Sequence, residues 1–122
     1  MLQTRSKKMI KRKEEMQHSI REKMRGGTKE VHVLDLMDKG TMAHCRLFSK
    51  MTLIPGSSIG EHEHTEETEY YWILQGEGIV TEKDGEHTVK EGDLVITGNG
   101  AKHAIRNDGK EDLVFLALII LD

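Results

Sequence analysis

Cysteine and long apolar runs are scarce in this chain of 122 residues, and each shortage excludes a class of protein. The single cysteine, Cys45, rules out an internal disulfide framework and favours a reducing compartment, so we expect a cytoplasmic protein. No apolar run reaches the roughly 20 residues that a membrane-spanning helix requires. The most apolar stretch, residues 113–121, has the length of a buried strand. The basic N-terminus has no hydrophobic region behind it, so no signal peptide is predicted.

Residues 5–25 contain no proline, glycine or aromatic residue and are rich in good helix formers, so we expect a basic helical segment over residues 1–25. This segment carries nine Lys or Arg against three Glu, a net charge of +6, which leaves −9 for the remainder of a chain of net charge −3. The absence of aromatic side chains argues against stacking on nucleic-acid bases, and the acidic remainder would repel a phosphate backbone. We therefore expect no nucleic-acid or membrane partner. The segment is interpreted as a solvated helix or a floppy tail, or as a helix that packs on the barrel or on a second subunit.

Residues 26–122 consist of short β segments separated by turn signals. Asp84-Gly85 predicts a tight hairpin, because a type I′ turn needs positive φ at both central positions. Pro55-Gly56, residues 91–93 and Asp108-Gly109 mark further turns. Many short strands at close spacing are typical of an all-β sandwich or barrel. We expect one all-β domain over residues 26–122.

Three histidines and one glutamate form the pattern that carries chemistry. Residues two apart on a strand point to the same face, so His62 and His64 project together. Glu69 follows after a gap long enough for a turn, and His103 lies behind a glycine-rich stretch that lets the backbone turn sharply. Three imidazoles and a carboxylate suit one divalent transition metal, such as Mn, Fe, Co, Ni, Cu or Zn, rather than Mg or Ca. An ion that prefers five or six ligands would keep open positions, whereas zinc could accept the four as a closed tetrahedral site.

Two stretches of the chain resemble the two sequence motifs of the cupin superfamily. The first is Gly56-x5-His62-x-His64-x4-Glu69-x6-Gly76. The second is Gly92-x5-Gly98-x-Gly100-x2-His103-x3-Asn107, with Gly98 where the family usually has proline. The sequence around the first motif is similar to that of small one-domain bacterial cupins of the oxalate-decarboxylase-like kind. The resemblance implies a double-stranded β-helix, the cupin jelly-roll barrel, with one metal ion (Mn, Fe, Ni or Zn) held by His62, His64, Glu69 and His103.

Strand alternation also gives candidates for a substrate pocket and for an interface. Tyr71 and Ile73 share the face of Glu69 and are expected beside the metal. Arg46 and Phe48 share a face of the preceding strand, and two alternatives stay open for it. If that face looks inward, Arg46 is the best candidate to hold a substrate carboxylate; otherwise it is a surface cation. Tyr70, Trp72 and Leu74 face away from the metal, and this apolar outer row predicts a homodimer.

The sequence favours a metalloenzyme that acts on a small oxygen-rich anion or sugar-like compound, as a decarboxylase, dioxygenase or isomerase. No catalytic residue beyond the metal ligands is identified, although Glu66 and Glu67 are candidates for acid-base chemistry. The alternative is a non-catalytic metal-dependent module that binds or senses a small ligand, favoured by the absence of a long lid loop. A third interpretation has the metal serve only to stabilise the fold.

Overall fold

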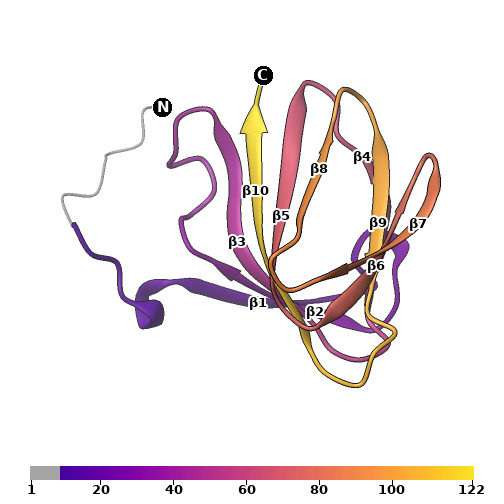
Figure 1. Cartoon of the computed structure of the whole chain (residues 1–122). Helices are drawn as coiled ribbons and strands as arrows, with labels where there is room; N and C mark the ends of the chain where they lie inside the picture. The colour runs from indigo at the N-terminus through magenta and orange to yellow at the C-terminus, as the bar shows by residue number, and fades with distance from the viewer. Residues whose placement is uncertain (1–8) are drawn as a thin grey trace.

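Ten strands form two antiparallel sheets in the computed structural model of the chain, which describes residues 9–122 (Figure 1). The six-stranded sheet has the order β1 (Gln17–Glu22), β2 (Glu30–Asp35), β3 (Cys45–Leu53), β10 (Leu113–Leu121), β5 (Glu67–Gln75) and β8 (Leu94–Gly98). The four-stranded sheet has the order β4 (Ser58–Glu63), β9 (Lys102–Arg106), β6 (Glu77–Glu82) and β7 (Gly85–Lys90). The all-β jelly roll predicted from the sequence is confirmed.

The core lies between the two sheets and follows the period-two pattern of the strands. On β10 the alternate residues from Leu113 to Ile119 are buried, and on β3 those from Cys45 to Leu53. The four-stranded sheet contributes Ile59, Val80 and Ile105, each 1% exposed. Burial of these apolar faces stabilises the fold and fixes strand register, because a slip of one residue would turn every core side chain outward.

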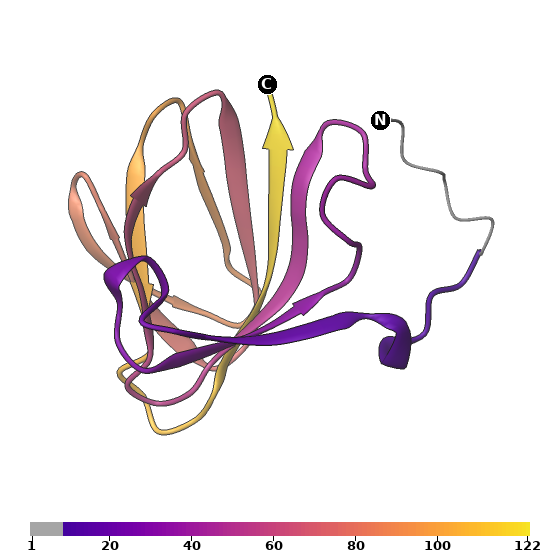
Figure 2. The ribbon, with the colours of Figure 1, turned by 180° about the vertical axis from the view of Figure 1, so that it is seen from behind.

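The prediction of a closed barrel is wrong. Within residues 9–122, no ladder of backbone hydrogen bonds joins one sheet to the other, and the two sheets face each other as separate layers (Figure 2). The chain crosses between the layers through turns with positive φ, at Gly76 between β5 and β6 and at Asn99 and Gly100 between β8 and β9. Such turns interrupt the ladder, so the layers meet through side chains rather than through backbone pairing.

The expected N-terminal basic helix is also wrong, for the part of it that the structure describes; residues 1–8 lie outside the described residues. From Met9 onward the segment holds two short 3-10 turns, η1 (Lys13–Glu15) and η2 (Met24–Gly26), with β1 between them. No helix in this part of the chain is long and apolar enough to cross a membrane. The few apolar residues of the segment, Met9, Met16, Ile20 and Met24, could not support a helix by burial. Pairing with β2 over Gln17 to Glu22 instead gives the β1 backbone hydrogen-bond partners along one edge.

Candidate metal centre

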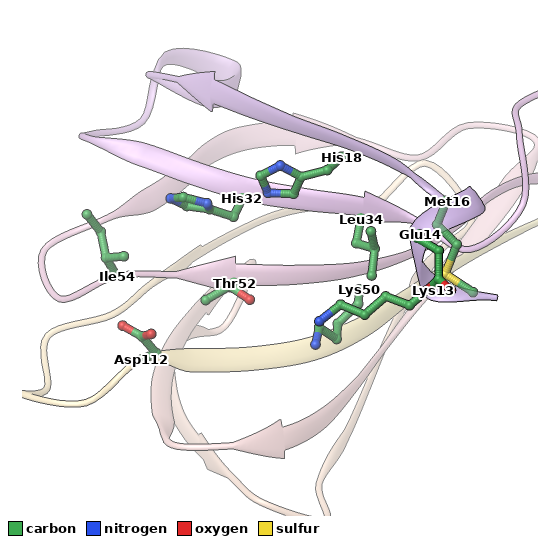
Figure 3. A pocket seen from close by; sticks show the side chains of 10 residues that line it. All are labelled: Lys13, Glu14, Met16, His18, His32, Leu34, Lys50, Thr52, Ile54 and Asp112. Carbon is green, nitrogen blue, oxygen red and sulfur yellow. The ribbon is translucent and has the colours of Figure 1, made fainter.

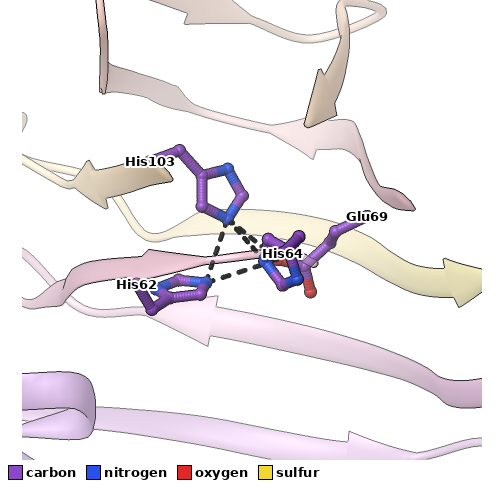
Figure 4. A group of neighbouring side chains, drawn as sticks. All are labelled: His62, His64, Glu69 and His103. Atoms are coloured by element: carbon purple, nitrogen blue, oxygen red, sulfur yellow. Dashed lines mark hydrogen bonds and ion pairs between the residues drawn. The ribbon is translucent and has the colours of Figure 1, made fainter. Parts of the chain in front are cut away.

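The four predicted ligands come together at one end of the space between the sheets (Figure 4). His62 on β4 is directly opposite His103 on β9 in the four-stranded sheet. His64 follows β4, where its backbone exchanges hydrogen bonds with the turn before β9. Glu69 comes from β5 in the opposite sheet, so the cluster bridges the two layers.

The ligand atoms of these four side chains converge on one point. Nε2 of His103 lies 3.0 Å from Nε2 of His62 and 3.1 Å from Nε2 of His64. Oε1 of Glu69 lies 2.8 Å from Nε2 of His64, 3.0 Å from Nε2 of His103 and 3.5 Å from Nε2 of His62. Glu69, His64 and His103 are buried, and the His62 side chain is only 9% exposed.

Each imidazole makes a second hydrogen bond through Nδ1, on the side away from the cluster. Nδ1 of His62 donates to the carbonyl of Gly60 at 2.8 Å, and Nδ1 of His64 donates to the carboxylate of Glu67 at 2.6 Å. Nδ1 of His103 lies 2.8 Å from Oγ1 of Thr97. Because a carbonyl and a carboxylate only accept, the protons of neutral His62 and His64 sit on Nδ1. Their Nε2 lone pairs therefore point into the cluster, which is the arrangement of metal-bound histidine.

The electrostatics of the cluster also favour a cation. Burial opposes ionisation of Glu69, but its contacts with the three imidazoles, each of which would donate to it once protonated, hold its pKa far below the usual range. Burial lowers the pKa of His103. Burial also acts to lower the pKa of His64, but hydrogen bonds to Glu69 and Glu67 outweigh it and raise that pKa. A buried anion surrounded by lone pairs needs a positive charge, from a proton or from a metal ion.

A cavity of about 340 Å³ opens onto this cluster. Its floor includes the buried core residues Val33, Met51, Ile59 and Ile119, beside His62, His64 and Glu69. This volume is at the lower end of the range for small-molecule sites, so it suits a ligand of a few heavy atoms. The residues around its opening are mostly cationic: Arg21, Glu22, Lys23, Arg25, Lys39 and Arg46.

Of the four residues predicted to line a substrate pocket, two line the cavity, Tyr71 and Arg46, and two do not, Ile73 and Phe48. Tyr71 lines the cavity, is 1% exposed, and stacks on the His103 ring with 5.0 Å between ring centroids. Burial raises the pKa of Tyr71 well above its usual value, so its phenol stays neutral. Ile73 is buried in the core and does not line the cavity, although it shares the inward face as expected.

Arg46 and Phe48 lie on the outward side of β3 but differ in what they contact. Phe48 lines an apolar groove on the outer face of the six-stranded sheet, away from the metal centre. Arg46, near the start of the strand, reaches the cavity opening and donates from Nε and Nη2 to the two oxygens of Glu67, at 2.9 and 2.7 Å. Glu67 therefore links Arg46 to His64. The sequence held a signal for this role, because Glu67 is two residues before Glu69 on the same inward strand face.

A second and wider groove lies on the outer face of strands β1 to β3 (Figure 3). His18 and His32 stack loosely there with ring centroids 5.6 Å apart, and Lys50, Thr52 and Ile54 continue the groove along β3. Val31, Val33, Met51 and Leu53 alternate with these residues and face the core. The sheet therefore separates this groove from the metal centre.

Comparison with known proteins identifies the family. Residues 49–119 match the family model described as "Cupin domain". The chain is 43% identical to an "Oxalate-binding protein" of Thermotoga maritima, over 93% of this chain and 94% of that protein. A crystal structure of "a predicted oxalate decarboxylase" from Thermotoga maritima superposes with a TM-score of 0.87 at 43% identity, over 93% of this chain and 100% of that one. A "Gentisate 1,2-dioxygenase" of Ralstonia is 37% identical over 57% of this chain, which is only 19% of that enzyme. The matched domain, the near full-length relative and the shared fold show that this chain belongs to the cupin family.

Proposed function

We propose that His62, His64, Glu69 and His103 hold one divalent transition metal ion and that the protein binds a small dicarboxylate such as oxalate at that ion. The observation that carries the proposal is the convergence of imidazole lone pairs on the Glu69 carboxylate. Protons alone satisfy this arrangement poorly, because a shared proton can lie between only two of the four atoms. A metal ion satisfies all four at once.

The spacing of the four atoms supports an ion with open positions. Ligand atoms about 2.1 Å from an ion lie about 3.0 Å apart at neighbouring octahedral positions and about 3.4 Å apart in a tetrahedron. Four of the five separations given above are 2.8–3.1 Å. This favours Mn, Fe, Co or Ni over a closed zinc site. A bidentate carboxylate would complete the shell of such an ion.

Oxalate is supported by the size and charge of the cavity and by the similarity to the oxalate-binding protein of Thermotoga maritima. A cavity of about 340 Å³ with a mostly cationic opening suits a small anion better than a sugar. The oxalate-binding relative matches 93% of this chain, so the likeness extends over both sheets and the cavity between them. Binding is therefore the function that these observations support best.

Turnover of the bound anion, by decarboxylation or oxygenation, is the second candidate function. It is favoured by the Arg46–Glu67 pair, which places ionisable groups other than the ligands beside the metal centre. The metal would supply a Lewis acid or a redox centre for that chemistry. Release of formate, or consumption of O₂ with a catechol-like acid, would distinguish the enzyme from the binding module.

We also propose that the protein is a homodimer that uses the outer face of the six-stranded sheet. Trp72, Leu94 and Ile96 are 49%, 53% and 59% exposed, although they lie on neighbouring strands of one face. Beside them is an apolar groove lined by Phe48, Tyr70, Leu116 and Leu118. At about half exposure, Trp72, Leu94 and Ile96 offer roughly 300 Å² of apolar surface, and the four partly buried groove residues extend this patch along the sheet. A second copy presenting the same face would bury both patches around a two-fold axis.

Elemental analysis and calorimetry test the main proposal. Protein purified without added metal or an affinity tag is expected to contain close to one transition metal ion per chain, and the loaded protein should bind oxalate. If the metal-free protein takes up none of these ions, the proposed metal site is wrong. If the metal-loaded protein does not bind oxalate, the proposed ligand is wrong. The buried free thiol of Cys45 supports a reducing, cytoplasmic location as part of the same proposal.

A further inference from the structure

Four cationic side chains at the cavity opening have no counterion among residues 9–122. Arg21, Lys23 and Arg25 come from β1 and the η2 turn, and Lys39 comes from the loop between β2 and β3. None of the four makes an ion pair with another residue of that range, and Glu22 is the only carboxylate beside them in the cavity lining apart from Glu69 at the metal centre. Arg46, the fifth cation, is already paired with Glu67. The opening therefore carries unneutralised positive charge.

Arg21 is directed toward the cavity by the pairing of β1 with β2. Arg21 is directly opposite Val31, and directly opposed residues of an antiparallel pair share a face of the sheet. Val31 is 0% exposed and belongs to the core. Arg21 thus occupies a position on the inward face, where the other strands carry apolar side chains. Arg21 is partly exposed and lines the cavity, so its guanidinium can meet an anion that enters there.

The turn that carries Lys23 and Arg25 is held rigidly against β4, the strand of His62 (Figure 2). Gly60 on β4 lies so close to the carbonyl oxygen of Arg25 that a Cβ there would overlap it. Lys23 and Arg25 have positive φ, 50° and 55°, a conformation that costs non-glycine residues energy and is characteristic of functional sites. Backbone packing therefore sets the position of the Cα atoms from which these two side chains extend.

Hydrogen bonds complete the attachment of this turn. Thr28 donates from Oγ1 to the carbonyl of Gly56 at 2.7 Å and from its backbone N–H to Oγ of Ser58 at 2.8 Å. Ser58 in turn donates from its backbone N–H to the carbonyl of Thr28 at 3.0 Å. The β1–η2 segment is thereby tied to the start of the strand that leads to the metal ligands.

We propose that Arg21, Lys23 and Arg25 form a fixed cationic rim that selects doubly charged small anions over singly charged ones at the metal centre. This proposal rests on the proposed function. The metal itself would attract any carboxylate, so the rim supplies the preference for a second negative charge. It also gives a role to three cationic residues at the end of the basic N-terminal segment.

Calorimetric titration of the Mn-loaded protein with oxalate and with glycolate tests the rim. Arg21→Gln and Arg25→Gln are each expected to weaken oxalate binding about tenfold, as loss of one charge-assisted contact does, and to weaken glycolate binding less. Metal content should not change, because neither arginine is a ligand. Arg12→Gln is the matched control, since it removes the same charge from the same segment but lies outside the cavity lining.

The outcomes separate the two proposals. If the wild-type protein binds metal but not oxalate, the proposed function fails and the rim proposal fails with it. If the wild-type protein binds oxalate and both cavity variants bind it as tightly as Arg12→Gln, only the rim proposal is overturned. Because Arg25 is exposed, its variant should fold even if Arg21→Gln does not. A fall in the oxalate-to-glycolate preference in Arg25→Gln alone would therefore sustain the proposal.

Discussion

Nδ1 of His64 donates a hydrogen bond of 2.6 Å to Glu67, and this contact determines which nitrogen of His64 faces the metal centre. Glu67 is in turn held by both arms of the Arg46 guanidinium. A carboxylate behind a metal-bound histidine fixes its tautomer and orientation and increases its basicity as a ligand. Glu67 is therefore a positioning residue for the proposed metal site, and Arg46 fixes the position of Glu67.

Replacement of Glu67 should weaken metal binding without removing a ligand. Glu67→Met is expected to raise the dissociation constant for Mn²⁺ about 10- to 100-fold, because His64 loses its fixed tautomer. Glu67→Gln keeps an acceptor oxygen and should lose less. Competition titration measures the affinity, and ¹⁵N shifts of the His64 ring in the metal-free protein report the tautomer directly.

Glu86→Gln provides the control for this series. Glu86 also pairs with an arginine, Arg106, but on the exposed face of the four-stranded sheet. That variant should bind Mn²⁺ like the wild type. A Glu67→Met protein with unchanged affinity and an unchanged His64 tautomer would show that the contact is merely structural.

His103→Ala should lose the metal ion and keep the fold. The substitution removes one of four ligands and the ring that stacks on Tyr71, yet leaves the apolar core between the sheets intact. Elemental analysis should find little metal, while circular dichroism still reports the β-sheet signal. His18→Ala, at an exposed histidine on the outer face of the six-stranded sheet, should retain full occupancy. Full metal occupancy in the His103→Ala protein would show that His103 is not a ligand.

The stability of the metal-free protein should decrease in acid. The Arg46 guanidinium holds the pKa of Glu67 below its usual 4.5, burial opposes this, and His64 adds to the lowering. A carboxyl whose pKa is lower in the folded chain stabilises the fold above the unfolded value and loses that contribution as the pH falls through the folded value. The free energy of unfolding should therefore drop below pH 4.5, as Glu67 becomes protonated.

Urea denaturation across that pH range measures the effect. Glu67→Gln has no carboxyl to protonate at this position, so its stability should fall less steeply than that of the wild type. Identical pH profiles for the two proteins would contradict the assignment of the lowered pKa to the Arg46 contact.

A charge on the outer face of the six-stranded sheet should dissociate the proposed dimer. Ile96 is 59% exposed in the single chain and lies within the apolar patch, so Ile96→Glu would place a desolvated carboxylate in the interface. Light scattering should show the mass of a dimer for the wild type and of a monomer for the variant. Thr88→Glu, on an exposed strand of the other sheet, should remain dimeric. A monomeric wild-type protein would disprove the interface.

Local patterns in the sequence are sufficient to predict the strands beyond residue 30 and the ligand candidates. Strand alternation places Tyr71 and Ile73 on the face of Glu69, and both are buried there. The two cupin motifs are enough to indicate the family, and the fold brings the ligand atoms of the four motif residues within 4.8 Å of one another. These features depend on residues near in sequence, whose spacing fixes which side chains share a face.

Tertiary structure alone decided the features that depend on distant partners. The helix formers of the basic segment became strand β1 because the edge of β2 offered backbone partners, a gain that no local propensity measures. Arg46 turned from a candidate substrate contact into the partner of Glu67, which is 21 residues further along the chain. Alternation within one strand fixes a face, but the contacts across that face depend on how two sheets pack. For this reason the sequence specified the four candidate ligands, whereas the residues that orient them and the proposed cationic rim became visible only in the fold.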